Sequence, residues 1–430
     1  MIMDNVIVMA AISLLVLLFI KVPVYISVLA ASALYFIFTD DTNPAMFAQL
    51  TLAGAQGLSL LAIPFFVMAG VFMNYTGVTR RIMECCAVLT SRMYGGLAQV
   101  NILLSTLMGG LSGSSLADAA MECKMLVPPM EKEGYSRPFA SVITAASGMI
   151  VPLIPPGTGL IIYACINNIS VGKLFIAGIG PGLVLSITLM VFTRFLAKRR
   201  GYLPRRKTPI PISEKLRAIR PAVLPLLLPI IIIGGVRIGI FTATEAGTVA
   251  IVYSLFLGLL YREMSFKDFL KGCKETVTTT SSIMMIVAAA SCFSWILTKE
   301  QIPQTLAEWI TVAISSKYLF LIIVNIFLIF VGMFVEGNAS MIVLAPLLHP
   351  VAVAFGIDPI HFAMVYIFNC TIGAFTPPMG TLIFVVCGIT RCPTKAFIRE
   401  SMPFYALFAA DMILLTFFPQ LTTFLVDLVY

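Results

Sequence analysis

Long apolar runs, separated by short polar segments, dominate the pattern of this chain. Ten of them have roughly the 20 residues that a helix needs to cross a bilayer core of about 30 Å. The pattern therefore predicts an all-α polytopic membrane protein with ten crossings. The runs lie near residues 5–20, 23–39, 58–75, 137–166 and 174–197, and near 222–240, 242–261, 277–298, 359–389 and 401–428.

Composition and charge agree with this interpretation. Hydrophobic residues make up 59% of the 430 residues and charged residues 11%, which is too apolar for a water-facing surface. Nine basic residues lie between Lys198 and Arg220, which predicts a cytoplasmic linker and, with five crossings on each side, periplasmic N- and C-termini. The net charge of +8 does not indicate nucleic-acid binding, because the basic residues cluster in loops without stacking aromatic residues around them.

Two further apolar stretches are interrupted by polar, glycine-bearing segments. The first runs from Gly95 to Met130 and breaks at 109–118, and the second runs from Tyr318 to Pro350. Non-helical backbone at membrane depth is tolerated only inside protein or beside a water-filled cavity. Each stretch is therefore predicted to form a re-entrant helical hairpin whose tip points at a cavity.

The two halves of the chain share a proline pattern. An offset of 222 residues superposes four prolines of one half on four of the other, where chance gives roughly one match, so an internal repeat is expected. Because each half has an odd number of crossings, the copies are expected to be inverted. The pairs are Pro128 and Pro350, Pro155 and Pro377, Pro156 and Pro378, and Pro181 and Pro403.

This repeat defines the expected domains. The first inverted repeat is predicted to cover 1–197, with a hairpin at about 95–130 and a broken helix at about 137–169. The basic linker covers 198–221. The second repeat covers 222–430, with a hairpin at about 318–350 and a broken helix at about 358–390.

Adjacent prolines flanked by glycines make continuous helix improbable at 147–159 and 370–381. Unwound backbone there would expose carbonyls to a cation, and half-helix N-termini would attract an anion. Oxygen ligands of this kind suit a hard cation such as Na⁺. The alternative is that these segments only kink and pack helices. The expected substrate pocket comprises Ser114, Asp118, Pro155, Pro156, Glu336, Asn338, Pro377 and Pro378.

Several motifs together resemble the large membrane subunit of TRAP (tripartite ATP-independent periplasmic) transporters over nearly the whole chain. They are LLAIPFFVMAG (60–70), LSGSSLAD (111–118), PLIPPG (152–157), LFIAGIGPG (174–182), FTATEAG (241–247) and TPPMG (376–380). The resemblance implies an elevator-type ion transporter fold in which a mobile domain slides against a scaffold. It also implies Na⁺ coupling, a periplasmic substrate-binding protein, a separate small membrane subunit of about four helices and a bacterial inner-membrane location.

The resemblance also implies two sodium sites. Carried over by position, Ser112, Ser115, Gly148 and Val151 form the first. Gly332, Gly373, Thr376 and Met379 form the second, mostly through backbone carbonyls.

The returning arm of the first hairpin departs from the family pattern. It carries Glu122 and Lys124 where small apolar residues are usual, and Asp411 is another acid within an apolar run. Intramembrane acids are costly and usually functional, so Glu122 has either a local ion pair or a role linked to substrate or cation. Asp411 is expected to bond to a neighbouring helix on the scaffold side.

Two other functions stay open at this level. A stand-alone ion-coupled anion carrier would need no binding protein. An intramembrane enzyme is disfavoured, because the chain has no HExxH motif and no GxSxG with a paired histidine. The substrate itself is not readable, and dicarboxylates, sialic acid and keto-sugar acids are all compatible with the pattern.

Overall fold

The computed structural model describes residues 2–20, 22–39, 42–314 and 316–430, and within these residues every regular element is a helix. Six of the described helices are long and apolar enough to cross a membrane. They are α10 (Val171–Arg199), α11 (Ile212–Arg237), α12 (Ala243–Tyr261), α13 (Phe266–Lys299), α16 (Gly337–Ala354) and α19 (Thr394–Phe417). The prediction of an all-α polytopic membrane protein is therefore confirmed.

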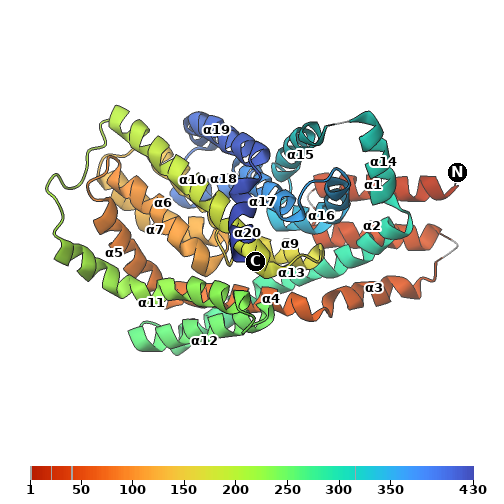
Figure 1. The fold of residues 1–430 in the computed structure, drawn as a ribbon, viewed down its shortest axis with the longest axis horizontal. Coiled ribbons are helices and arrows are strands. Elements are labelled where there is room, and N and C mark those ends of the chain that lie inside the picture. The colour runs from red at the N-terminus through yellow and green to blue at the C-terminus, as the bar shows by residue number, and fades with distance from the viewer. Residues whose placement is uncertain (1, 21, 40–41, 315) are drawn as a thin grey trace.

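One group of helices forms a layer along the lower edge and right side of the molecule in Figure 1. Its longest member, α13, packs against α2, α3 and α4, while α12 lies on α4 and α11 lies on α5 and α12. We call this set the outer group. Besides α11, α12 and α13 it contains α1 (Ile2–Phe19), α2 (Val24–Phe38), α3 (Ala45–Ala55), α4 (Ala62–Tyr75), α5 (Val78–Thr90) and α14 (Ile302–Ala313).

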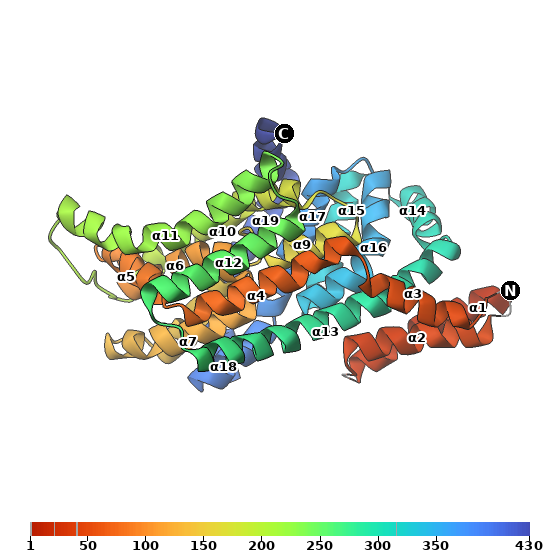
Figure 2. The same cartoon turned by 90° about the horizontal axis from the view of Figure 1, so that it is seen from below.

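The second set, which we call the inner group, contains both predicted hairpins. Figure 2 shows α12, α4 and α13 crossing in front of it. Its members besides α10, α16 and α19 are α6 (Gly96–Ser112), α7 (Ser115–Lys132), α8 (Arg137–Gly148), α9 (Thr158–Ile166), α15 (Lys317–Gly332), α17 (Pro359–Phe375), α18 (Thr381–Thr390) and α20 (Gln420–Val429). Large side chains such as Phe139, Phe175, Phe362 and Phe404 are fully buried here, so this group contains much of the apolar core.

Helix boundaries in the inner group repeat along the chain. Helices α6 to α10 start 221 to 223 residues before α15 to α19, respectively. The hairpin arms α6 and α7 are 17 and 18 residues long, and α15 and α16 are 16 and 18. The inverted orientation of the two halves and the domain bounds given above stay predictions.

Polar side chains cap the first turns of two long helices of the outer group, α12 and α13. Thr242 and Glu245 form a reciprocal capping box at the start of α12, which satisfies two otherwise unpaired amides. Ser265 and Asp268 do the same at the start of α13. That helix then continues unbroken for 34 residues, a length of about 50 Å.

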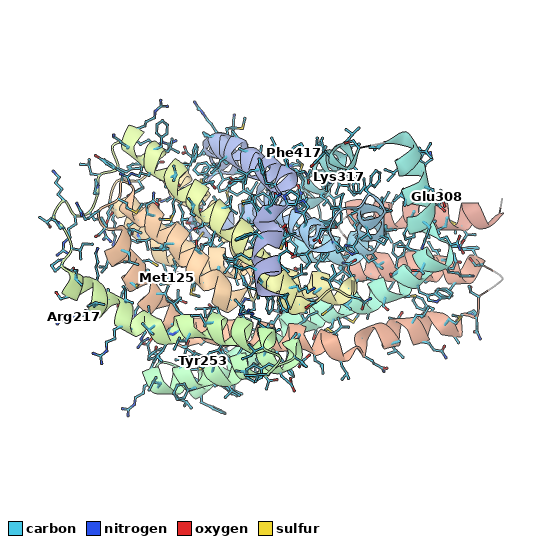
Figure 3. All side chains as sticks on the ribbon, in the orientation of Figure 1. Met125, Arg217, Tyr253, Glu308, Lys317 and Phe417 are labelled. Carbon is cyan, nitrogen blue, oxygen red and sulfur yellow. The ribbon has the colours of Figure 1, made fainter. Side chains whose placement is uncertain are left out.

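The basic segment between the halves is partly helical. Coil follows α10, and α11 already begins at Ile212 within the predicted linker. The labelled Arg217 lies at the outer end of α11 in Figure 3. Arg200 pairs with Glu400 at 2.5 Å and Arg205 with Glu133 at 2.8 Å, so ion pairs hold the coil against the inner group.

Candidate functional site

The first hairpin turns at Gly113, directly against the interruption between α8 and α9. Gly113 has φ +65°, a left-handed conformation that glycine adopts without strain. Its carbonyl oxygen accepts hydrogen bonds from the Thr158 amide at 3.3 Å and the Thr158 hydroxyl at 2.9 Å. Ser114 then caps α7 by accepting from the Ala117 amide. The tip and the start of α9 are thus bonded directly.

The residues predicted for the first sodium site lie on facing segments. Gly148 ends α8, and a Cβ built on it would lie 3.3 Å from the Ser115 carbonyl oxygen. A Cβ on Gly109 would lie 3.3 Å from the Val151 carbonyl oxygen. Ser112, at the end of α6, is buried. Close approach of these backbones therefore brings carbonyl and hydroxyl oxygens of the hairpin and the interruption together.

The residues predicted for the second site also approach through glycines. A Cβ built on Gly373 would lie 2.6 Å from the Cα atom of Gly332, so the two backbones touch. The Thr376 amide donates to the Gly373 carbonyl at 3.0 Å, and the Thr376 hydroxyl donates to the Ile372 carbonyl at 2.6 Å. Met379 lies in the short turn between α17 and α18.

A cavity of about 390 Å³ lies between the two hairpin tips, the two interruptions and α13. The first residues of four helices line it: Ser115 of α7, Thr158 of α9, Gly337 of α16 and Thr381 of α18. Helix N-termini carry partial positive charge and present unpaired amides, which favours an anion. No lysine or arginine belongs to the described lining of this cavity, and Glu336 is its one acid.

The eight residues predicted for the pocket do not all line this cavity. Ser114, Glu336 and Asn338 do, and Glu336 also caps α16 by accepting from the Ala339 amide at 3.1 Å. The remaining five lie outside the described lining. They are Asp118, Pro155, Pro156, Pro377 and Pro378. The two Pro-Pro bonds among them are both cis.

Sequence reasoning missed the contribution of α13. Thr278, Thr279 and Ser282 of this outer-group helix line the cavity opposite the hairpin tips. The sequence feature that could have indicated this contribution is the run of threonines and serines at 278–282 inside an apolar segment. It was missed because a hydroxyl-rich stretch in a membrane helix also serves helix packing.

Three buried acids lie in the inner group. The Ser112 hydroxyl donates to Asp118 at 2.5 Å, while the other carboxyl oxygen of Asp118 is buried and has no hydrogen-bond partner among the described residues. Glu122 accepts from Ser105 at 2.8 Å. Asp411 of α19 accepts from Thr188 of α10 at 2.8 Å, so this acid bonds to a neighbouring helix, but to one of the inner group and not to a helix on the expected scaffold side.

Comparison with known proteins identifies the family. The model of the DctM component of the tripartite ATP-independent periplasmic (TRAP) transporters matches residues 11–421. The chain belongs to this family. It is 39% identical to the sialic acid TRAP transporter large permease protein SiaM of Vibrio cholerae, over 96% of each chain. It is also 39% identical to the C4-dicarboxylate TRAP transporter large permease protein DctM of Pseudomonas aeruginosa, over 86% of each chain.

A solved structure shares the fold of this TRAP family member. The YdaH transporter of Alcanivorax borkumensis superposes with a TM-score of 0.63 over 89% of each chain at 14% sequence identity. The relatives are transport permeases, so the chain is a multi-span transport protein and the alternative of an intramembrane enzyme is excluded.

Proposed function

We propose that this chain is the transport subunit of a Na⁺-coupled uptake system for a small organic anion, and that it works by an elevator movement. Both permeases compared above are named for organic acids, sialic acid in one and C4-dicarboxylates in the other. An acid of this size is compatible with a cavity of about 390 Å³.

The composition of the cavity lining carries the proposal. An anion needs compensating positive charge when it leaves water, and the described lining supplies no basic side chain. Four helix N-termini supply part of this charge. Cations bound beside the cavity would supply the rest, so solute affinity would depend on bound Na⁺.

The oxygen atoms at the two predicted sodium sites support this role. Hydroxyl and carbonyl oxygens are the ligands that hard cations prefer. A cluster rich in thiols or histidines would instead suit a transition metal. One carboxyl oxygen of Asp118 accepts from Ser112, so the other, unpaired oxygen of this acid would offer a further oxygen ligand near the first site. Ligands at the second site would come from Gly332, Gly373, Thr376 and Met379.

The arrangement of the two helix groups supports the elevator movement. Both hairpins and both interruptions lie within the inner group, whereas α13 of the outer group forms the opposing wall of the cavity. A displacement of the inner group along α13 would carry the cavity toward one side of the membrane or the other. The inner group would then be the mobile domain and the outer group the scaffold.

The family is tripartite, which supports two protein partners. We propose that a periplasmic binding protein delivers the solute and that a small membrane subunit of about four helices accompanies this chain. The complex would lie in the bacterial inner membrane with both termini of this chain in the periplasm.

Reconstitution tests the proposal. The chain, its small membrane subunit and its binding protein are placed in proteoliposomes, and uptake of labelled sialic acid and of labelled succinate is measured. We expect an inward Na⁺ gradient to drive uptake of one of these acids, and equal Na⁺ on both sides to abolish accumulation. Equal accumulation when K⁺ replaces Na⁺ would overturn the sodium coupling.

The same vesicles address the stand-alone alternative. The chain alone, without binding protein or small subunit, is expected to accumulate neither acid. Full Na⁺-driven uptake by the chain alone would favour a carrier that needs no partner.

A further inference from the structure

Glu122 lies in the middle of α7 and is completely buried. Met125, less than one turn further along this helix, is labelled in Figure 3. The Ser105 hydroxyl lies 2.8 Å from each carboxyl oxygen of Glu122, and the Ser147 hydroxyl lies 3.4 Å from one of them. The carboxyl group thus bridges α6, α7 and α8.

No basic side chain faces this carboxyl group among the described residues. Glu122 takes part in none of the described ion pairs, and Lys124 is exposed. The local ion pair considered from the sequence is therefore absent from this part of the chain. A buried carboxylate without a cationic partner is strongly unfavourable, so Glu122 requires either a proton or a bound cation.

The titratable groups around Glu122 supply no positive charge. Asp118 precedes it by one turn of α7, and Cys123 adjoins it. Cys86 faces it from α5, and Cys387 of α18 faces Cys123. The described side chains that bond to Glu122 from α6 and α8 are hydroxyls. All four titratable groups are acids or thiols, so none of them can compensate a negative charge on Glu122.

Geometry favours a proton over a metal ion. A hydroxyl 2.8 Å from both carboxyl oxygens is at hydrogen-bond distance, which leaves no room for a cation between these atoms. The Ser147 hydroxyl already bonds to the Asn101 side chain at 2.8 Å and to the Thr144 carbonyl at 3.0 Å. A proton needs no additional space.

The position of Glu122 connects it with the first predicted sodium site. Ser147, which contacts the carboxyl group, directly precedes Gly148. One turn before Glu122, Asp118 accepts a hydrogen bond from Ser112. The charge of Glu122 therefore acts on both segments that would hold the ion.

We propose that Glu122 is a proton-binding site whose occupancy controls Na⁺ affinity at the first predicted sodium site. The inference rests on the proposed sodium coupling. A proton taken from water forms an O–H bond on Glu122 and removes its negative charge. Its release to water restores the carboxylate, which attracts Na⁺ nearby. Protons and Na⁺ would thus compete without sharing ligands.

Sodium binding measured against pH tests this coupling without a known substrate. The purified chain in lipid nanodiscs is titrated with NaCl by calorimetry across roughly pH 5 to 9, the range in which buried carboxyls titrate. We expect native affinity to rise about tenfold with pH. Glu122→Gln mimics the protonated acid and should keep the low affinity throughout. Asp411→Asn is the matched control, because this buried acid also accepts from a hydroxyl of a neighbouring helix, and it should retain the native dependence.

Infrared spectroscopy gives a second measurement on the native chain, independent of sodium. We expect a protonated-carboxyl C=O band that disappears as pH rises, that is absent in Glu122→Gln and that shifts in Ser105→Ala. If Glu122→Gln does not fold, the native titration and the Ser105→Ala shift still decide the proposal.

Distinct outcomes separate failure of the proposal from failure of sodium coupling. A pH-dependent sodium affinity that persists in Glu122→Gln would overturn the proposal, and so would a native carboxyl band that does not change with pH. A band that saturating Na⁺ removes completely even at the lowest pH would assign Glu122 to a metal ion instead. A native chain that binds no Na⁺ at any pH while the Glu122 band titrates would overturn the sodium coupling and leave Glu122 as a proton site.

Discussion

At the scale of single residues, the sites combine glycines that allow close backbone approach with hydroxyls that offer oxygen ligands. A Cβ built on Gly332 would lie 2.9 Å from the Gly373 Cα atom, and one built on Gly373 would lie 2.6 Å from the Gly332 Cα atom. Neither position therefore has space for a side chain. Thr376 uses its hydroxyl hydrogen on the Ile372 carbonyl, which leaves the oxygen lone pairs for a cation. In the proposed second site, the glycines would thus allow close backbone contact and offer carbonyl oxygens, while Thr376 would add a hydroxyl oxygen.

Thr376→Ala tests the second sodium site. Loss of one oxygen ligand worth about 1.4 kcal/mol should raise the Na⁺ concentration for half-maximal binding by about tenfold, measured by calorimetry on the purified chain. Thr298→Ala is a matched control, because this hydroxyl also donates to a carbonyl four residues earlier but lies far along α13. Unchanged sodium affinity in Thr376→Ala would show that Thr376 is not a ligand of the second site.

Ser115→Ala should have a smaller effect on sodium affinity if Ser115 contributes its carbonyl oxygen, because the substitution leaves that oxygen in place.

At the scale of elements, α13 both packs against other helices and lines the cavity. Its amino-acid composition alone does not show which residues serve which role. It packs against α2, α3, α4 and α14 of the outer group, and its hydroxyl-bearing face lines the cavity opposite the hairpin tips. Successive residues of a helix differ by about 100° in direction, so only some of the five residues at 278–282 face the cavity. Thr278, Thr279 and Ser282 belong to the described lining, and Ser281 does not.

Ser282→Leu tests this face of α13. A larger apolar side chain should narrow the cavity and lower the rate of solute uptake at least about tenfold, an effect of roughly 1.4 kcal/mol, while sodium binding by the purified chain stays unchanged. Ser281→Leu introduces the same side chain at an exposed neighbouring position and should transport normally. Equal loss of uptake in both variants would indicate disturbed helix packing and contradict the assigned lining.

At the scale of the whole molecule, the cavity belongs to neither helix group alone. The inner group supplies four helix N-termini and both interruptions, while the outer group supplies the wall formed by α13. Any relative movement of the groups must therefore change the surroundings of a bound solute. The proposed elevator movement depends on this arrangement.

A reversible cross-link between the groups tests the movement. Thr279 of α13 and Asn338 of α16 both line the cavity, so cysteines at these positions can be joined by a cleavable bifunctional reagent. Native cysteines in the structure are buried or partly buried, which limits background reaction. We expect most of the uptake in proteoliposomes to disappear on cross-linking and to return on cleavage. Each single-cysteine variant serves as control, and full transport in the cross-linked protein would contradict the elevator movement.

Local features of the sequence were enough to predict the helical fold, the hairpin turn near Gly113 and the interruptions at the Pro-Pro pairs. Apolar run length, glycine conformation and the missing amide of proline act over a few residues, so they can be recognised without knowing the neighbours. The Thr278–Ser282 face and the partners of Glu122 could not be assigned in this way. They depend on contacts between segments far apart in the chain.

The sequence by itself thus determined the all-helical class, the hairpin turn near Gly113 and the interruptions at the two Pro-Pro pairs. The oxygen ligands that it suggests for Na⁺ stay a prediction. Only the tertiary structure decided that four helix N-termini meet at one cavity, that α13 closes it, and that Glu122 meets two serines instead of a basic residue. The physical reason is that helix formation follows local hydrogen bonding and hydrophobic length, whereas charge compensation and cavity shape arise from packing between distant segments.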